Sequence, residues 1–462
     1  MQPRVVIAGT QSGVGKTTLA TGLMAAMTKK GYDVQPYKVG PDYIDPGFHT
    51  AATERISRNL DSWMVSSDKL IELFDRNSQG ADISIIEGVM GLFDGHRVDE
   101  GDGSTAEVAK ILSAPVILII DAGKMAQSGA ALAYGYKHYD SELNLAGVIL
   151  NRVSSDSHYQ ILKEPIEELG ISVLGYIPRQ ESLELPERHL GLVPTSETSQ
   201  MDDYIDDLAE VILQNLDLKE LYNLAAETEE VEVKKKTLFS QTGPVSEVKL
   251  AVARDEAFNF YYEDNLDLLE ENGVELEYFS PVFDTALPED IAGLYIGGGF
   301  PESFLAELSD NQSMQKSIKE AIVAGMPVYA ECGGLMYLTE AITDFEGETH
   351  SMVGSISGRI EMTDRLQAMG YAEAEVKEDN ILLNQGDKVR GHEFHYSRLV
   401  SLPEDTTYAY RLTGGKGRDN RAGGILKDNL LASYLHLHFA SNPAVIDNLI
   451  DSCLKFIEGS SY

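Results

Sequence analysis

The sequence predicts an α/β fold made of two doubly wound domains, and three observations lead to it. Short runs of β-branched and aliphatic residues alternate with amphipathic stretches of helical period, as in parallel sheets covered by helices on both faces. This alternation occurs twice, on either side of an acidic, turn-rich segment. A length of 462 residues also exceeds what one compact core usually holds.

The first domain is expected over residues 1–216 and a linker over residues 217–246. Buried strands are predicted at Arg4–Ala8, Asp33–Lys38, Ile83–Ile86, Val116–Ile120, Leu145–Leu150 and Ile171–Tyr176. Helices are predicted at Leu19–Lys30, Gln160–Leu169 and Asp203–Asn215. The linker is acidic, and its start near Leu218–Ala226 has a helical pattern.

The second domain is expected over residues 247–462. Strand-like runs resume at Lys249–Ala253, Glu275–Phe279, Gly293–Ile296 and Pro327–Ala330, with helices predicted at Tyr262–Glu271 and Asn311–Ala324. Beyond residue 350 the strand signals become shorter and closer together, which predicts an antiparallel extension of the sheet.

The composition narrows the class of partner. Lys and Arg number 37 against 74 Asp and Glu, a net charge of −37. Such a surface repels phosphate backbones and anionic lipids, so we expect neither a nucleic-acid nor a membrane partner. Cys332 and Cys453 are the only cysteines and lie far apart in sequence, which fits a reducing cytoplasm.

A phosphate-binding loop is predicted at Gly9–Thr18, between the first strand and the first helix. A glycine-rich turn there presents backbone N–H groups to a phosphate, with Lys16 reaching the outer phosphates and the Thr17 hydroxyl ligating Mg²⁺. Five residues separate Gly9 from Gly15, one more than usual. The nucleotide-binding candidates in this loop are Gly13, Gly15, Lys16, Thr17 and Thr18.

Further polar residues follow neighbouring strands. Glu87 ends an apolar strand, at the edge where such sheets bind ligands, and can hold Mg²⁺. Lys38, Asp42 and Asp45 form a Pro- and Gly-held loop, which is either a capped turn or part of the nucleotide site, and we favour the site. Asn151 closes another strand, where a purine-edge contact and a plain turn are equally open.

A cysteine nucleophile is predicted at Cys332, where a short apolar strand meets a helix. A sharp turn exposes the thiol, and the helix N-terminus favours the thiolate. Gly333 next to it and the turn at Gly298 and Gly299 are the candidate oxyanion donors and glutamine-site residues.

The base for this thiol is expected from two histidines far downstream. His436 and His438 are two residues apart on an extended segment, so they would face the same way. One would take the thiol proton and the other would orient it. Arg390 and Arg398 either hold a substrate carboxylate or are simply solvated.

These motifs together carry a resemblance over nearly the whole chain. The phosphate loop resembles that of dethiobiotin synthetase, and the Cys332 turn with its late histidine resembles a triad-type, class I glutamine amidotransferase. In this order, and with the strings Tyr37–Pro46 and Glu87–Gly95, the sequence resembles the cobyrinate a,c-diamide synthase family, which includes the nickel-sirohydrochlorin enzyme of methanogens.

The resemblance implies a P-loop NTPase-type sheet followed by an amidotransferase domain, and a reaction for each. ATP would phosphorylate the a and c acetates of a tetrapyrrole polycarboxylate, for cobalamin or coenzyme F430, and ammonia from glutamine would give the amides. It also implies that Glu87 binds Mg²⁺, that Asp42 and Asp45 act in synthesis, and that His436 is the base of Cys332.

One departure from the family pattern affects the third member of the triad. Related amidotransferases often carry Glu two positions after the histidine, where this sequence has His438. Lys38, Arg390 and Arg398 are the candidates for a basic patch that holds the tetrapyrrole carboxylates.

Two other functions compete with this one. A partitioning-type ATPase usually carries a signature Lys five residues before the loop lysine, where this chain has Gln11, and it would leave Cys332 idle. A cobyric acid synthase would amidate other side chains of the same ring, and the Tyr37–Pro46 string argues against it. A homodimer remains an open expectation.

Overall fold

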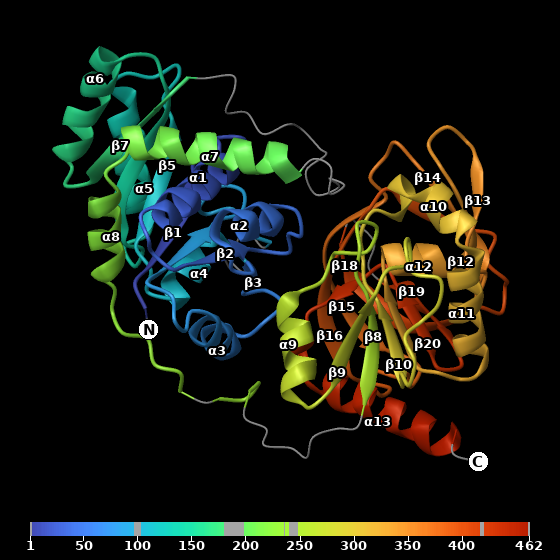
Figure 1. Cartoon of the computed structure of the whole chain (residues 1–462). Helices are drawn as coiled ribbons and strands as arrows, with labels where there is room; N and C mark the ends of the chain where they lie inside the picture. Colours follow the sequence, from blue (N-terminus) through green and yellow to red (C-terminus); the bar gives the residue numbers. More distant parts are fainter. Residues whose placement is uncertain are drawn as a thin grey trace. The chain divides into compact units, whose positions relative to one another are not determined.

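The structure is a computed structural model that describes residues 2–96, 103–179, 198–234, 236–239, 248–415 and 420–460, with side chains left out at 198–200 and 460. The chain divides into two compact units, unit 1 (Met1–Thr237) and unit 2 (Leu238–Tyr462), and each is described by itself (Figure 1). Residues 235 and 240–247 of the expected linker lie outside the described residues.

Unit 1 is a parallel sheet of seven strands in the order β3-β2-β4-β1-β5-β6-β7. Its strands are β1 (Arg4–Gly9), β2 (Val34–Val39), β3 (Arg58–Leu60), β4 (Ile83–Glu87), β5 (Val116–Asp121), β6 (Leu145–Val153) and β7 (Ser172–Pro178). Its helices are α1 (Lys16–Lys29), α2 (Asp45–Thr53), α3 (Ser67–Asn77), α4 (Thr105–Ile111), α5 (Ser128–Tyr139), α6 (Asp156–Glu167), α7 (Thr198–Asn215) and α8 (Leu218–Ala226).

Both faces of this sheet are covered, which confirms the doubly wound prediction. Val5 and Ile7 of β1 belong to a core with α1, α7 and α8, whereas Val6 and Ala8 belong to a core with α3, α4, α5 and α6. Figure 1 shows α7 beside α1, and the two helices are in contact. The helix predicted at the start of the linker is α8, and its Leu221 is buried in the first of these cores.

The topology of unit 1 fixes where a ligand binds. β1 pairs with β4, and the helices that follow these two strands, α1 and α4, cover opposite faces of the sheet. The loops after these strands therefore separate at the carboxyl edge and leave a crevice there, which is where open α/β sheets bind ligands. Four of the predicted site residues lie at this edge. Lys16 is the first residue of α1, Glu87 is the last residue of β4, and Lys38 and Asn151 lie near the ends of β2 and β6.

Unit 2 contains a mixed sheet of ten strands in the order β21-β16-β15-β18-β19-β20-β11-β10-β8-β9 and a separate four-stranded sheet, β13-β12-β14-β17. Its strands are β8 (Lys249–Ala253), β9 (Glu275–Phe279), β10 (Gly293–Ile296), β11 (Val328–Glu331), β12 (Thr339–Thr343), β13 (Thr349–Ser351), β14 (Ile356–Met362), β15 (Ala368–Val376), β16 (Lys388–His395), β17 (Ser397–Val400), β18 (Thr407–Gly414), β19 (Arg421–Lys427), β20 (Leu430–Ser433) and β21 (His436–Leu437). Its helices are α9 (Glu263–Glu271), α10 (Leu305–Asp310), α11 (Gln312–Val323), α12 (Gly333–Leu338) and α13 (Ala444–Ser460), with 3₁₀ turns at Pro301–Ser303 and Phe439–Ser441.

The ten-stranded sheet has a parallel and an antiparallel part. β8, β9, β10, β11 and β20 pair in parallel, and β15, β16, β18 and β19 pair antiparallel beyond them. This arrangement agrees with the predicted antiparallel extension. Among the residues that the structure describes, no helix combines the length and the apolar composition needed to cross a bilayer.

Candidate functional site

The phosphate loop of unit 1 connects β1 directly to α1 and is fixed in shape by Asn151. Gly15 adopts a left-handed conformation with φ of 92°, and a Cβ there would lie 2.6 Å from Asn151 Nδ2. Asn151 Nδ2 donates to the Val14 carbonyl at 2.8 Å, and its Oδ1 accepts from the Arg152 N–H at 2.8 Å. Asn151 therefore holds the loop in shape. A contact with the purine edge, for which its second Nδ2–H would be the donor, stays a prediction.

Lys16 lies inside the loop. Its side chain is buried, and its Nζ donates to the carbonyl of Gln11 in the same loop at 3.3 Å. Burial and the nearby charge of Lys38 lower the pKa of Lys16, and Glu87, Asp45 and Asp94 partly offset them. A lysine in this position beside the helix N-terminus can bind an anion such as phosphate.

A cavity of about 670 Å³ opens beside the loop. Polar groups of Asp121, Asn151 and Arg179 line it, and Leu208 and Ile212 of α7 add an apolar surface. Thr18 also lines it, next to Gly15. A volume of this size suits a nucleoside, which presents an apolar base and a polar sugar.

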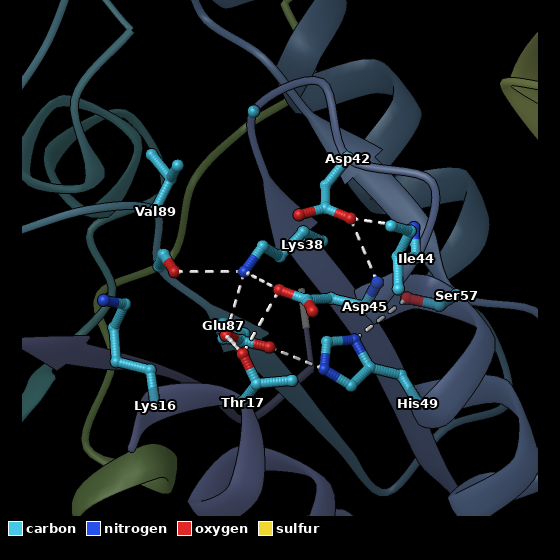
Figure 2. A network of polar contacts seen from close by, with 12 residues as sticks. Lys16, Thr17, Lys38, Asp42, Ile44, Asp45, His49, Ser57, Glu87 and Val89 are labelled. Carbon is cyan, nitrogen blue, oxygen red and sulfur yellow. Dashed lines mark hydrogen bonds and ion pairs between the residues drawn. The ribbon is translucent and has the colours of Figure 1, made fainter. Parts of the chain in front are cut away.

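Lys38 and two carboxylates form a buried network next to the loop (Figure 2). Lys38 Nζ lies 2.5 Å from Asp45 Oδ2 and 2.8 Å from Glu87 Oε1. The Thr17 hydroxyl reaches the same two groups, at 2.8 Å from Glu87 Oε1 and 3.2 Å from Asp45 Oδ2. The structure thus brings four of the predicted site residues to one point, from β2, α2, β4 and α1.

The charges of this network shift the pKa values of its members. Burial alone would raise the pKa of Glu87, but Lys38 and His49 outweigh it and lower that pKa to about 2. Burial and Glu87 raise the pKa of Asp45 to about 6 despite Lys38. Burial opposes the charged form of Lys38, but the two carboxylates outweigh it and raise the pKa of Lys38.

These oxygens fit a Mg²⁺ ion. Carboxylate and hydroxyl oxygens are the ligands that this hard cation prefers, and Glu87, Asp45 and Thr17 present them together beside the phosphate loop. Two carboxylates share one close ammonium, so the local charge also favours a further cation.

His49 was not predicted as a site residue, yet it touches the network. Its side chain is fully buried, with Nε2 2.7 Å from Glu87 Oε2 and Nδ1 3.4 Å from Ser57 Oγ. The sequence signal was its position four residues after Asp45, which places both side chains on one face of α2.

Asp42 precedes α2 and shapes its start. Its Oδ1 accepts the N–H of Ile44 at 2.8 Å and of Asp45 at 3.0 Å. This is the capped turn that the sequence left open, and it orients Asp45 towards Lys38. A direct role of Asp42 in synthesis stays a prediction.

In unit 2, Cys332 occupies a sharp turn between β11 and α12. Its backbone has φ 46° and ψ −100°, a conformation rare for a residue with a side chain, and its N–H donates to the Ser433 carbonyl at 2.7 Å. A Cβ at Gly334 would lie 2.2 Å from the Ile296 carbonyl oxygen, so only glycine fits there. The strained turn is of the kind that carries a nucleophile, but the expected exposure of the thiol is wrong, because Cys332 is only 6% exposed.

Two glycine-rich turns meet beside Cys332. A Cβ at Gly333 would lie 3.1 Å from the Gly299 nitrogen, so the two backbones are in contact. Within the described ranges, no backbone acceptor takes the N–H of Gly299 or Gly333, whereas Gly298 N–H donates to the Phe260 carbonyl at 3.3 Å. Gly298 instead makes room for His436, whose Cε1 would lie 2.4 Å from a Cβ there.

His436 comes from β21 and is hydrogen-bonded to Cys332. It is 3% exposed. Burial disfavours the imidazolium, but the bond to Cys332 and the carboxylate of Glu331 outweigh it and raise the pKa of His436 to about 10. The raised pKa favours a protonated His436 beside the Cys332 side chain, an arrangement that suits a cysteine nucleophile and its base.

His438 does not take the orienting position that the sequence proposed for one of the two histidines. Its fully buried ring stacks on Tyr262, with 5.0 Å between centroids. The group that faces His436 Nδ1 is Glu331, whose Oε2 lies 3.5 Å away. Sequence reasoning missed Glu331, although a glutamate that ends an apolar strand directly before Cys332 was a visible signal.

Each of the three cations of the predicted basic patch lies beside a carboxylate of its own unit. Arg390 on β16 lies 3.7 Å from Glu373, and Arg398 on β17 lies 2.5 Å from Glu361. These two strands belong to different sheets of unit 2. Lys38 in unit 1 is enclosed by its two carboxylates, so a contact of these cations with substrate stays a prediction.

Two family models match the chain, one in each unit. The CobQ/CobB/MinD/ParA nucleotide binding domain matches residues 5–193, and the CobB/CobQ-like glutamine amidotransferase domain matches residues 249–444. The matches support ATP as a substrate of unit 1 and glutamine as a substrate of unit 2.

Several similar proteins match nearly the whole length of the chain. A cobyrinate a,c-diamide synthase of Dehalococcoides mccartyi strain CBDB1 is 47% identical over 97% of both chains. Those of Caldanaerobacter subterraneus and Archaeoglobus fulgidus are 46% and 44% identical over 98% of each chain. With the phosphate loop and the cysteine site both in place, the chain belongs to the cobyrinate a,c-diamide synthase family, whose members are glutamine-dependent amidating ligases of cobalamin biosynthesis.

Proposed function

We propose that unit 1 activates the a and c acetates of a tetrapyrrole with ATP as acyl phosphates, and that ammonia released at Cys332 then displaces phosphate. The observation that supports this proposal is that the two units hold chemically different clusters of polar side chains. The network of Lys38, Asp45 and Glu87 beside the phosphate loop suits phosphoryl transfer, and the Cys332–His436 pair suits glutamine hydrolysis.

A carboxylate needs activation because its oxygen is a poor leaving group. Lys16 would hold the outer phosphates, and Lys38 would counter the negative charge of the acetate as it approaches the γ-phosphate. Thr17, Glu87 and Asp45 would hold Mg²⁺, which when bound supplies positive charge to the phosphate oxygens. Lys38 and His49 lower the pKa of Glu87 to about 2 although the side chain is buried, so Glu87 is ionised at neutral pH, which supports this role.

Glutamine hydrolysis would follow the chemistry of a thiolate nucleophile. The Cys332 sulfur attacks the side-chain carbonyl carbon of glutamine, and the N–H groups of Gly299 and Gly333 bind the oxygen as it becomes negative. His436 gives its proton to the leaving ammonia, and a thioester forms. Water, deprotonated by His436, then releases glutamate and restores the thiolate.

The substrate assignment rests on the names of the three relatives described above, which are cobyrinate a,c-diamide synthases. Purified protein with ATP, Mg²⁺ and glutamine should convert cobyrinate to its diamide, read from the product mass. Nickel-sirohydrochlorin is assayed in parallel as the second substrate. Amidation of neither compound would contradict the proposal, and nickel-sirohydrochlorin alone would move the chain to coenzyme F430 synthesis.

Several properties remain predictions of the same proposal. We expect the enzyme in the cytoplasm, with catalytic domains at 1–216 and 247–462, and leave a homodimer open beside a monomer. Light scattering at the concentration of the assay measures the particle mass, and a mass of one chain of 50.7 kDa would exclude the dimer.

A further inference from the structure

Glu331 is a buried carboxylate directly before the cysteine nucleophile. It ends the otherwise apolar strand β11 and is 1% exposed. An ionised carboxylate at such a position is costly unless hydrogen bonds compensate it. Its Oε1 accepts from the Tyr329 hydroxyl at 2.5 Å and the Leu437 N–H at 3.0 Å, and its Oε2 accepts from the Tyr295 hydroxyl at 3.2 Å.

These bonds aim the second carboxylate oxygen at the base. Leu437 follows His436 on β21, so its bond to Oε1 ties the carboxylate to the strand that carries the imidazole. Oε2 then lies 3.5 Å from His436 Nδ1, at the outer limit of a hydrogen bond. Catalytic contacts of this length commonly tighten when substrate binds.

The turn at Cys332 explains how adjacent residues reach one ring. Neighbouring side chains of an extended strand point to opposite faces, so Glu331 and Cys332 would diverge if the strand continued. The φ of 46° at Cys332 ends the alternation at that residue. Both side chains can therefore contact His436, one at Nδ1 and the other through the thiol.

We propose that Glu331 is the positioning residue of the glutamine site and orients His436 by accepting its Nδ1–H. The proposal rests on the proposed role of Cys332. Glu331 holds the ring so that Nε2 faces the thiol, and its charge stabilises the imidazolium opposite the thiolate. It takes the role that the family resemblance assigns to a glutamate two residues after the histidine, a position at which this chain has His438 stacked on Tyr262.

The test reads the thiolate directly in the full-length protein. The rate at which iodoacetamide alkylates Cys332, located by peptide mass, is measured against pH for the parent protein, Glu331→Gln, Glu331→Asp and Tyr329→Phe. We expect Glu331→Gln to raise the midpoint of this profile by about one pH unit or more, because the imidazolium loses its carboxylate. Glutaminase kcat should fall about 100-fold with little change in the KM for glutamine.

The relative sizes of the midpoint shifts in the variants distinguish an orienting role of Glu331 from a purely structural one. Glu331→Asp keeps the charge but is shorter, whereas Glu331→Gln keeps the length and an acceptor for Leu437 N–H. We therefore expect the smaller midpoint shift from Asp, and the reverse order would overturn the proposal. If Glu331→Gln does not fold, Glu331→Asp must still shift the midpoint more than Tyr329→Phe does. The shorter Asp side chain withdraws the carboxylate from Nδ1, whereas Tyr329→Phe leaves the bonds from Leu437 N–H and the Tyr295 hydroxyl to hold it. An equal or smaller shift would refute it.

Failure of this proposal can be told from failure of the proposed function. If Cys332→Ser keeps its glutaminase, the role of Cys332 is wrong, whatever Glu331 does. If Cys332 is required and its alkylation profile is unchanged in Glu331→Gln, only the role of Glu331 is wrong. Ammonia-dependent amidation should survive in every variant of Glu331 and so reports on the integrity of unit 1.

Discussion

Replacement of Glu87 by Gln tests the buried network of unit 1 quantitatively. The change keeps the shape of the side chain but removes the charge that lies 2.8 Å from Lys38 Nζ. Lys38 then keeps the Asp45 carboxylate and the Gly88 carbonyl as partners in the network, although both Lys38 and Glu87 are almost fully buried. Loss of one partner of a buried ion pair is strongly destabilising, because the remaining charge is left with less compensation.

The size of the effect follows from the pKa of Glu87. It is lowered from 4.5 to about 2, and a shift of this size corresponds to about 3 kcal/mol of folding free energy. Because the folded pKa lies below the unfolded one, this stabilisation is present above pH 4.5 and is lost as the pH falls through about 2. Glu87→Gln should therefore lower the free energy of unfolding by about 3 kcal/mol at neutral pH, and less in acid.

Trp63 makes the measurement specific to unit 1. It is the only tryptophan of the chain and is buried in unit 1, so its fluorescence during urea unfolding reports on that unit alone. Glu164→Gln on the exposed face of α6 is the control for loss of one charge, and its effect should stay below about 0.5 kcal/mol. The reasoning would be refuted if the parent and Glu87→Gln had the same free energy of unfolding at pH 7 and lost it equally as the pH falls.

Three further variants test single residues. Lys16→Met should abolish amidation with either glutamine or ammonia and leave glutaminase intact, so a loss of both activities would contradict the separation of sites. Asn151→Ala should raise the KM for ATP and GTP alike if it only holds the loop at Val14, and a selective loss of ATP would instead establish the purine-edge contact. Gly299→Ala places a Cβ 2.0 Å from the Ala257 carbonyl oxygen, so thermal unfolding and glutaminase assays should show a destabilised unit 2 with little activity.

The elements that sequence predicted well are those with strong periodicity. The six strands predicted in unit 1 all occur, because runs such as Val116–Ile120 are buried on both faces and need apolar residues at every position. The strand β3 was missed, since three residues carry no period. In unit 2 the crowded signals beyond residue 350 indicated antiparallel strands, but their pairing into two sheets depends on contacts distant in sequence.

The site was predictable where chemistry follows a local motif. Lys16, Thr17, Glu87 and Cys332 each stand at a strand end or turn that their neighbours in sequence define. Glu331 was not found, because its partner His436 is distant in sequence and only the pairing of β11 with β20 and the course of the chain to β21 bring them together. The prediction of His438 as the orienting group was wrong for a related reason. Strand periodicity predicts which way a side chain points, but not that Tyr262, distant in sequence, packs against it.

The two-site mechanism is tested most directly by Cys332→Ser, assayed for diamide formation with glutamine and with ammonium chloride as the nitrogen source. We expect glutamine-dependent amidation to disappear while the ammonia-dependent rate stays within about 2-fold of the parent, because the network of Lys38 and Glu87 is untouched. If both activities vanished together, or if glutamine still supported amidation, the division of the reaction between Cys332 and the phosphate loop would be wrong.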